Sequence, residues 1–468
     1  MTAVTSPVAG RGVRWPLAGL SLAMLLPSLG TSIANPALPT FADDFGASFQ
    51  GVQWVVLAYL LAMTTLVVGA GRLGDLLGRR RLLLGGVAVF AVASAIAACA
   101  PGLWLLITAR AMQGAGAAVM MSLATALVGD LVPREKTGSA MGMLGTTSAV
   151  GTALGPSLGG FLVAGFGWPA IFVSLAALAT ATFFVLRVAT PPRPSASQPT
   201  GKQFDTLGVV LLGLTLAAYA LAMTVGHGAF VGTSLLLASG AGVALFAVVQ
   251  TRVVSPTIQV SWLRDNQLRF GLIATALVST IMMSTLAVGP FFLAGALGLK
   301  PGAIGLAMSV GPVLAAVTGL PAGRMVDRFR ARPIMLVGLL GIVAGCLSLA
   351  LLSMTIGAVG YVIAIGTVAT GYAAFQVANN TTILRDVDPD RRGVLAGLLN
   401  LARNLGLITG ASAMGALFAS GSGAGGVARS VAVASGTGLT FAVAAGLGVV
   451  AFVLAVFADR QGSYSARD

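Results

Sequence analysis

Charged residues are scarce in this chain, making up only 9% of its 468 residues. Soluble domains carry roughly 25% charged residues, so a surface this poor in charge is not expected to stay in water. Hydrophobic residues, in contrast, make up 57% of the chain. We therefore expect lipid to surround most of the protein, which makes the bilayer its first partner.

Cysteine and histidine are also scarce, and their scarcity excludes several kinds of site. The two cysteines, Cys99 and Cys346, lie far apart in apolar runs, which is typical of small packing residues and not of a disulfide framework. The single histidine, His227, lies between glycines and is predicted to be a loop residue. With no Walker-type loop for ATP and no clustered acids in the apolar runs, we expect no metal, no cofactor and no enzyme.

The net charge of +14 would by itself suit a nucleic-acid-binding protein. Nearly all the Lys and Arg residues, however, stand in short clusters between long uncharged runs. That placement is typical of the cytoplasmic loops of a membrane protein and not of a basic docking face. Nucleic acid is therefore not an expected partner.

The long uncharged runs predict helices that cross the membrane. A helix needs about 20 residues to cross the hydrocarbon core. Three runs are long enough for two crossings each, and they break near 165–169, 226–232 and 355–360. Counted in this way, the chain has fourteen spans. The runs are 15–42, 45–71, 82–109, 111–129, 137–186, 206–251, 270–299, 301–323, 333–384, 404–428 and 430–458.

The positive-inside rule tests this count. With both termini in the cytoplasm, 23 of the 27 Lys and Arg residues lie on the cytoplasmic side. Only Lys300 and Arg429 then lie outside, while Arg110 and Arg403 fall within spans. The first apolar run lacks a small-residue cleavage site, so we interpret it as a retained span. We expect a multi-pass protein of the plasma (inner) membrane.

A short pattern occurs twice along the chain. Gly71–Asp75 follows the second span, and Gly323–Asp327 follows the second span of the later half. Parallel repeats of six spans are a known architecture of transporters. We therefore predict an all-α integral membrane protein with one six-helix bundle at 1–186 and another at 270–468. The segment 187–269 supplies two linkers and two additional central helices.

The segment 71–81 is the sharpest local motif. Its glycines allow a tight turn, Asp75 can lie near the positive end of a helix, and the arginines that follow can pair with it. Such a cluster can latch one conformation of a transporter and release it in another, although a plain basic loop is the alternative. The predicted latch comprises Gly71, Arg72, Asp75, Gly78, Arg79 and Asp327.

This segment closely resembles the loop motif of the major facilitator superfamily. Arg110–Gly116 resembles the fourth-helix motif of the drug:proton antiporters in that superfamily, and the glycines of 142–160 resemble their fifth-helix antiporter motif. The resemblance covers 21–458 and implies a major facilitator fold that exports small molecules in exchange for protons. The fourteen-span branch of the family is resembled by Gln53-Trp54 with Tyr59, by Phe204-Asp205 before Gly208, and by Asn400–Gly406.

Arg110 lies inside an apolar span, where a charge costs about 2.5–3.5 kcal/mol on the insertion scale. A buried arginine is a functional candidate for that reason, and a structural arginine paired with backbone carbonyls is the alternative. In the family, the matching arginine is implicated in proton coupling. The predicted coupling residues are Arg110, Gln113, Gly114 and Asp205.

Proline and glycine mark the fifth span. Pro156 removes a backbone hydrogen bond and can bend its helix, and the glycines around it permit close packing. In the family, this segment is thought to seal the pathway and favour exchange over leakage, while glycine used only for packing is the alternative. The predicted antiporter helix carries Gly151, Gly155, Pro156, Gly159 and Gly160.

One position departs from the family pattern. Gly30 stands where the family usually has an aspartate that serves as a proton and cation site. All thirteen acidic residues of the chain lie in loops or near span ends. We therefore expect neutral or anionic substrates over lipophilic cations, and any proton coupling to use Asp75 or Asp205.

The sequence predicts an exporter of drugs, antibiotics or metabolites that works as a monomer by alternating access, with protons as the coupling ion. An uptake carrier or facilitator for a neutral or anionic metabolite is one alternative, and a non-transporting membrane sensor is another. Methionine suits varied ligands, although plain packing is its commoner role. The predicted substrate residues are Thr31, Asn35, Trp54, Tyr59, Met282, Met283, Gln376, Asn379, Asn400 and Arg403.

Overall fold

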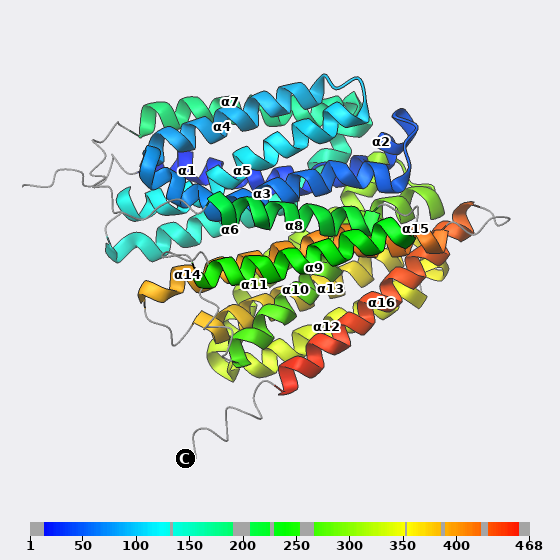
Figure 1. Ribbon diagram of the computed structural model, residues 1–468. Helices are drawn as coiled ribbons and strands as arrows, with labels where there is room; N and C mark the ends of the chain where they lie inside the picture. Colours follow the sequence, from blue (N-terminus) through cyan, green and yellow to red (C-terminus); the bar gives the residue numbers. More distant parts are fainter. Residues whose placement is uncertain are drawn as a thin grey trace, which may run out of the picture.

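The computed structural model describes residues 14–131, 134–190, 206–224, 229–252, 266–351, 353–384, 389–422 and 429–457. Within these ranges the chain is almost entirely helical and contains no strand (Figure 1). The predicted all-α fold class is therefore confirmed. Asp205 and His227 lie outside the described residues, so their predicted roles stay predictions.

The helices are long enough to cross a membrane. In the described ranges, thirteen helical stretches have the length and apolar composition of a membrane span. A shorter apolar stretch, Val210–Met223, lies in helix α8 (Thr206–Thr224), which corresponds to the remaining predicted span. The structure thus supports thirteen of the fourteen predicted spans by length and composition. The remaining predicted span corresponds to the shorter apolar helix α8.

Glycine and proline end the helices where the sequence predicts breaks. Gly167 has a φ of 79°, and Pro169 begins the following helix. Gly357 has a φ of 63° and interrupts a helix inside the predicted break at 355–360. Residues with a Cβ rarely adopt a positive φ, which explains why glycine occupies both points.

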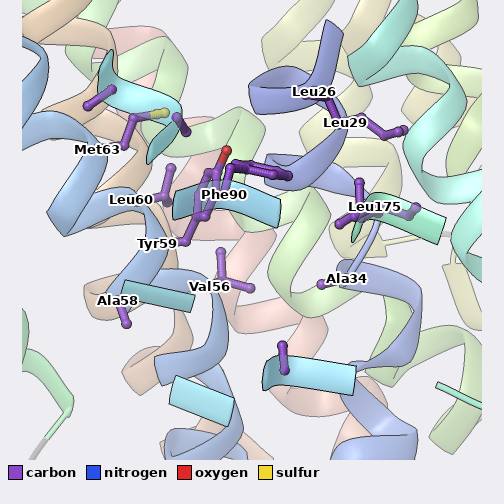
Figure 2. Packing of buried hydrophobic residues seen from close by; sticks show 14 of the residues in the cluster. Leu26, Leu29, Ala34, Val56, Ala58, Tyr59, Leu60, Met63, Phe90 and Leu175 are labelled. Carbon is purple, nitrogen blue, oxygen red and sulfur yellow. The ribbon is translucent and has the colours of Figure 1, made fainter. Parts of the chain in front are cut away.

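The first half of the chain, α1 to α7, packs around one apolar core. Figure 2 shows part of this core, where Tyr59 and Phe90 lie among leucines of neighbouring helices. The elements are α1 (Arg14–Ser32), η1 (Asn35–Ala37), α2 (Leu38–Asp44), α3 (Phe49–Leu77), α4 (Arg79–Ala98), α5 (Leu103–Leu131), α6 (Arg134–Phe166) and α7 (Pro169–Ala189).

The second half, α10 to α16, surrounds a second core. Two of its helices continue into short π-helical segments, η3 after α10 and η4 after α14. The elements are α10 (Asn266–Phe291), η3 (Phe292–Ala296), α11 (Pro301–Phe329), α12 (Ala331–Leu351), α13 (Ser353–Leu384), α14 (Pro389–Thr409), η4 (Gly410–Met414), α15 (Gly415–Ser422) and α16 (Arg429–Phe457).

Helices α8 and α9 (Ala229–Arg252) lie side by side along the line where the two halves meet (Figure 1). Helix α8 contacts α3 in the first half and η4 in the second, while α9 packs mainly on α8. Most side chains of α9 are exposed, which suits a helix with lipid around it. The exact domain limits at 186 and 270 stay a prediction.

The repeated sequence pattern has a structural counterpart. Gly78, with a φ of 91°, joins α3 to α4, and Arg330, with a φ of 70°, joins α11 to α12. The two turns are therefore similar, although the second lacks glycine. Gly71 and Gly74 lie inside α3, so the tight turn begins at Gly78 and not at the start of the motif.

Candidate functional site

The first span is interrupted at the point where the two halves meet. After Ser32 the α-helix stops, and Asn35–Ala37 forms a single 3-10 turn that contacts α6, α10 and α11. Asn35 is fully buried, and its amide nitrogen donates to the carbonyl of Thr31 at 3.5 Å. Its side-chain oxygen, Oδ1, has no hydrogen-bond partner among the described residues.

Arg110 lies on α5 and is fully buried. Its Nε donates to the carbonyl of Val55 on α3 at 2.9 Å, and its Nη2 donates to the carbonyl of Gly30 on α1 at 2.9 Å. Its Nη1 donates to Oε1 of Gln113 at 2.6 Å. The guanidinium carbon also lies 4.2 Å from the centre of the Tyr59 ring. These contacts join three helices around one positive charge.

The hydrogen-bond network continues from Gln113 to a fourth helix. The amide nitrogen of Gln113 donates to Oγ of Ser94 on α4 at 2.6 Å. Ser94 in turn donates to the carbonyl of Phe90 at 2.6 Å. Gly114, next to Gln113, packs so closely on α3 that a Cβ there would meet the backbone of Tyr59. Glycine at this point lets α3 and α5 approach each other.

The charge of Arg110 is thus balanced by carbonyl groups, an amide and an aromatic ring. Among the described residues, no carboxylate contacts the guanidinium of Arg110. At position 30 its partner is a backbone carbonyl, that of Gly30. A Cβ at Gly30 would lie 3.1 Å from Oη of Tyr59 and 3.3 Å from Cζ of Phe90. A side chain at position 30 would therefore enter this network. The predicted coupling role of Arg110 stays a prediction, and its bonds to the backbone fit the structural alternative.

Helix α6 uses its glycines on two faces. One face packs on α1, where a Cβ at Gly151 would lie 2.7 Å from the carbonyl of Leu25. Gly155 and Gly159 continue this face, against Ser32 and Ile33. Pro156 lies inside the helix between them. The glycines thus hold α6 directly against the first span.

The opposite face of α6 packs on α11 of the second half. A Cβ at Gly160 would lie 2.6 Å from Cα of Gly305, and a Cβ at Gly305 would lie 2.6 Å from the carbonyl of Pro156. The two helices therefore meet backbone to backbone. The partner glycine, Gly305, is not part of the predicted antiporter helix, and only the tertiary structure identifies it.

Aromatic rings and one amide close the same end of the protein. The ring of Phe49 lies 4.6 Å from that of Phe291 and 4.8 Å from that of Phe418. Gln53, also on α3, donates from Nε2 to the carbonyl of Ala411 at 2.8 Å. We call this end, with the start of α3 and α11 and the end of α6 and α10, the closed end.

The halves separate away from the closed end. The residues of α10 that are buried in the core of the first half, Met283 and Ala287, both lie in the later part of that helix. The residues of α14 and η4 that are buried in that core, Ile408 and Ala411, likewise lie where α14 ends and η4 follows. The contacts between the halves are therefore concentrated near one end.

The predicted latch is described only in part. The side chains of Arg72 and Asp75 lie outside the described ones, and Asp327 is exposed on α11. Arg80, which the prediction omitted, caps the last turn of α7 by donating to the carbonyls of Thr190 and Arg187. Arginine at a helix C-terminus is favourable because it satisfies free carbonyls. The latch stays a prediction.

The predicted substrate residues do not all gather in one place. Asn379 is buried and donates to Oγ1 of Thr275 at 2.9 Å and to the carbonyl of Gly271 at 3.3 Å, so it ties α13 to α10. Met283 is buried in the first core. Asn35 and Tyr59 are also buried, and Asn400 is exposed. The remaining predicted substrate residues are half-buried: Thr31, Trp54, Met282, Gln376 and Arg403.

Comparison with known proteins agrees with this architecture. A profile of the Major Facilitator Superfamily matches residues 20–411 and 272–466. The riboflavin transporter RibZ of Clostridioides difficile is 27% identical over 402 residues, which make up 86% of this chain and 87% of that protein. The multidrug resistance protein Stp of Mycobacterium tuberculosis is 30% identical over 410 residues, covering 86% of this chain and 75% of that protein.

A solved structure has the same fold. It is a bacterial homologue of the human lysosomal transporter Spinster, in an inward-facing and unoccupied conformation. The TM-score is 0.71 at 15% identity, and the match covers 97% of this chain and 98% of the other.

Proposed function

This chain belongs to the major facilitator superfamily and is therefore a multi-pass membrane transporter and not an enzyme, and we propose that it exports small molecules by alternating access. In such a cycle, two bundles rock about a central site that opens first to one side and then to the other. The relative named for multidrug resistance supports export, and the one named for riboflavin supports a small organic substrate.

The observation that carries this proposal is the position of α6 between α1 and α11. Gly151 and Gly155 hold it against the first half, and Gly160 meets Gly305 of the second half. A helix packed this closely on both sides leaves little room for solvent to pass. Exchange without leakage needs such a seal at one end while the other end is open.

We place the closed end outside the cell and both termini in the cytoplasm of a cell whose plasma membrane holds the protein. The distribution of Lys and Arg along the sequence supports this orientation. The structure would then be open towards the cytoplasm, where an exporter takes up its substrate.

Protons are the coupling ion that we propose, by resemblance to the antiporters. The absence of an acid at Gly30 moves the titrating group elsewhere, and Asp75 and Asp205 are the candidates near the cytoplasmic ends of spans. Two arginines within spans, Arg110 and Arg403, and no acidic residue deep in a span favour neutral or anionic substrates. A monomer in the bilayer is sufficient for this mechanism.

A drug-susceptibility panel in a bacterial host that lacks its own pumps tests the export. The wild type should raise the inhibitory concentration of at least one compound, and Arg110→Ala should abolish the increase. Gly165→Ala is the control, because a Cβ at Gly165 meets nothing within 4 Å. A panel on which the wild type protects against no compound would contradict export.

Inverted membrane vesicles test the direction and the driving force. An exporter should accumulate its compound inside inverted vesicles, and an imposed pH gradient should accelerate this accumulation. Accumulation only in right-side-out vesicles would favour the uptake carrier, for which the riboflavin transporter is the relevant relative. Accumulation that ignores the pH gradient would contradict proton exchange.

A further inference from the structure

Arg403 lies inside the apolar span that α14 begins. Helix α14 begins at Pro389, and Arg403 is fourteen residues further along it. At a rise of 1.5 Å per residue, this places Arg403 about 21 Å from the start of the helix. The span continues through η4 and α15 to Ser422. The apolar stretch of this span begins at Leu398, so Arg403 lies five residues, about 8 Å, inside it, on the side where α14 begins.

The neighbours of α14 fix the direction in which Arg403 lies. Ala402 and Gly406 pack on α10, with a Cβ at Gly406 meeting the carbonyl of Ala276. Ile408 and Ala411 belong to the core of the first half. At about 100° per residue, Arg403 lies between these two faces, about 80° from the first and about 110° from the second.

On the other side of α14, the space between these two faces is occupied by helix α8. Thr409, on the opposite side of α14, accepts a hydrogen bond from Oη of Tyr219 on α8 at 3.2 Å. Arg403 therefore lies on the side between α3 and α10, where the two halves separate. Asn400, one turn earlier on the same side, is exposed, and Arg403 itself is half-buried.

The guanidinium of Arg403 has no hydrogen-bond or ion-pair partner in the part of the chain that the structure describes. Arg110, in contrast, donates three hydrogen bonds. No acidic residue of the sequence lies deep in a span. A charge inside an apolar span is costly, and an arginine there without a partner is a functional candidate.

A second polar group without a partner lies on the helix that packs against α14. Ser279 of α10 is buried, and its Oγ has no hydrogen-bond partner among the described residues. It packs beside Gly406, where a Cβ would lie 2.7 Å from Cβ of Ser279. The guanidinium on α14 and the hydroxyl on the neighbouring α10 are both donors, and such a pair suits an oxyanion.

We propose that Arg403 binds an acidic group of the substrate, a carboxylate or a similar oxyanion, between α3, α10 and α14, with Ser279 as a second donor. The planar guanidinium can grip both oxygens of a carboxylate, which a point charge cannot do. This inference rests on the proposed transport function and names the substrate class that the protein carries.

Two pairs of fluorescent dyes test the proposal: fluorescein with its methyl ester, and rhodamine B with its ethyl ester. The members of each pair differ only in whether the carboxyl group is free. Binding is measured with the purified full chain in lipid nanodiscs. In the wild type, the acid of at least one pair should bind about tenfold to a hundredfold more tightly than its ester, the range for a hydrogen bond to a charged group.

Substitutions at Arg403 separate charge from geometry. Arg403→Gln should remove the preference for the acid and leave ester binding unchanged, Arg403→Lys should keep part of it, and Ser279→Ala should reduce it severalfold. Arg269→Gln is the matched control, since Arg269 lies exposed on α10 and pairs with Asn266. Each variant is checked for a single peak in gel filtration, and Arg403→Lys tests the proposal if Arg403→Gln does not fold.

The proposal is overturned if no acid binds better than its ester to the wild type, or if Arg403→Gln keeps the preference. Dye efflux from cells is measured with the same variants. A wild type that binds the acid but does not export it contradicts the export function and leaves the role of Arg403 intact. Efflux that still favours the acid in Arg403→Gln contradicts the role of Arg403 alone.

Discussion

The contact between Gly160 and Gly305 allows a sharp test of how the closed end is held. A Cβ at Gly160 would lie 2.6 Å from Cα of Gly305 and 2.7 Å from the carbonyl of Pro301. Both neighbours are backbone atoms and cannot rotate away, so Gly160→Ala should force α6 and α11 apart. We expect this variant to open the closed end.

The size of the effect follows from the overlap. Ordinary carbon contacts lie at about 3.5–4.0 Å, so the helices must separate by about 1 Å. Overpacking of this kind typically costs about 1–3 kcal/mol. If the cost falls only on the closed conformation, the ratio of open to closed molecules should rise about fivefold to a hundredfold.

Spin labels across the closed end measure this ratio. Asp44, at the end of α2, and Lys300, just before α11, are both exposed and can be replaced by labelled cysteines. The native Cys99 and Cys346 are first removed. Pulsed electron resonance should show a longer distance between the labels in Gly160→Ala than in the otherwise wild-type chain.

Gly165→Ala on the same helix is the matched control, because it adds the same methyl group where nothing lies within 4 Å. It gains the same helix propensity, about 1 kcal/mol, without the overlap. Equal distance distributions in Gly160→Ala and Gly165→Ala would refute the reasoning, since the close contact would then not hold the end shut.

Four further changes have defined outcomes. Phe49→Ala removes two ring contacts worth about 0.5–1.5 kcal/mol each and should lengthen the same spin-label distance. Arg110→Lys lacks the planar fork and should lose at least about tenfold in export rate while gel filtration stays normal. Gly30→Asp brings a carboxylate beside Arg110 and should make export more dependent on the pH gradient in vesicles. Arg330→Gly relieves a φ of 70° and should raise the free energy of unfolding by about 1–3 kcal/mol, seen as a higher melting temperature, whereas Arg328→Gly inside α11 should lower both.

Much of the fold could be predicted from the sequence because a bilayer imposes simple rules. Uncharged runs gave the spans, and glycine or proline marked their breaks, as at Gly167 and Gly357. The motif at 71–81 misled in one respect, since Gly71 and Gly74 lie within α3 and the turn comes at Gly78. A glycine in a membrane helix serves packing as readily as turning, and the sequence alone does not separate the two roles.

The site was less predictable because its partners leave no pattern in the sequence. Arg110 was found from its charge, but the carbonyls of Val55 and Gly30 that accept its hydrogen bonds belong to the backbone, which every residue has. Gln53 was noted only beside Trp54, and its bond reaches Ala411 across the two halves. Contacts of this kind depend on how the bundles dock, which local periodicity does not encode.

The π-helical segments bear on how the closed end can move. Gly410–Met414 stands between α14 and α15, and it holds one more residue per turn than an α-helix would. If this turn rewinds as an α-helix, α15 rotates by about 100°, the angle between successive residues. Phe418 would then swing off Phe49 while α14 stays in place. A change of winding within one helix would release the outer aromatic contact before the bundles themselves move.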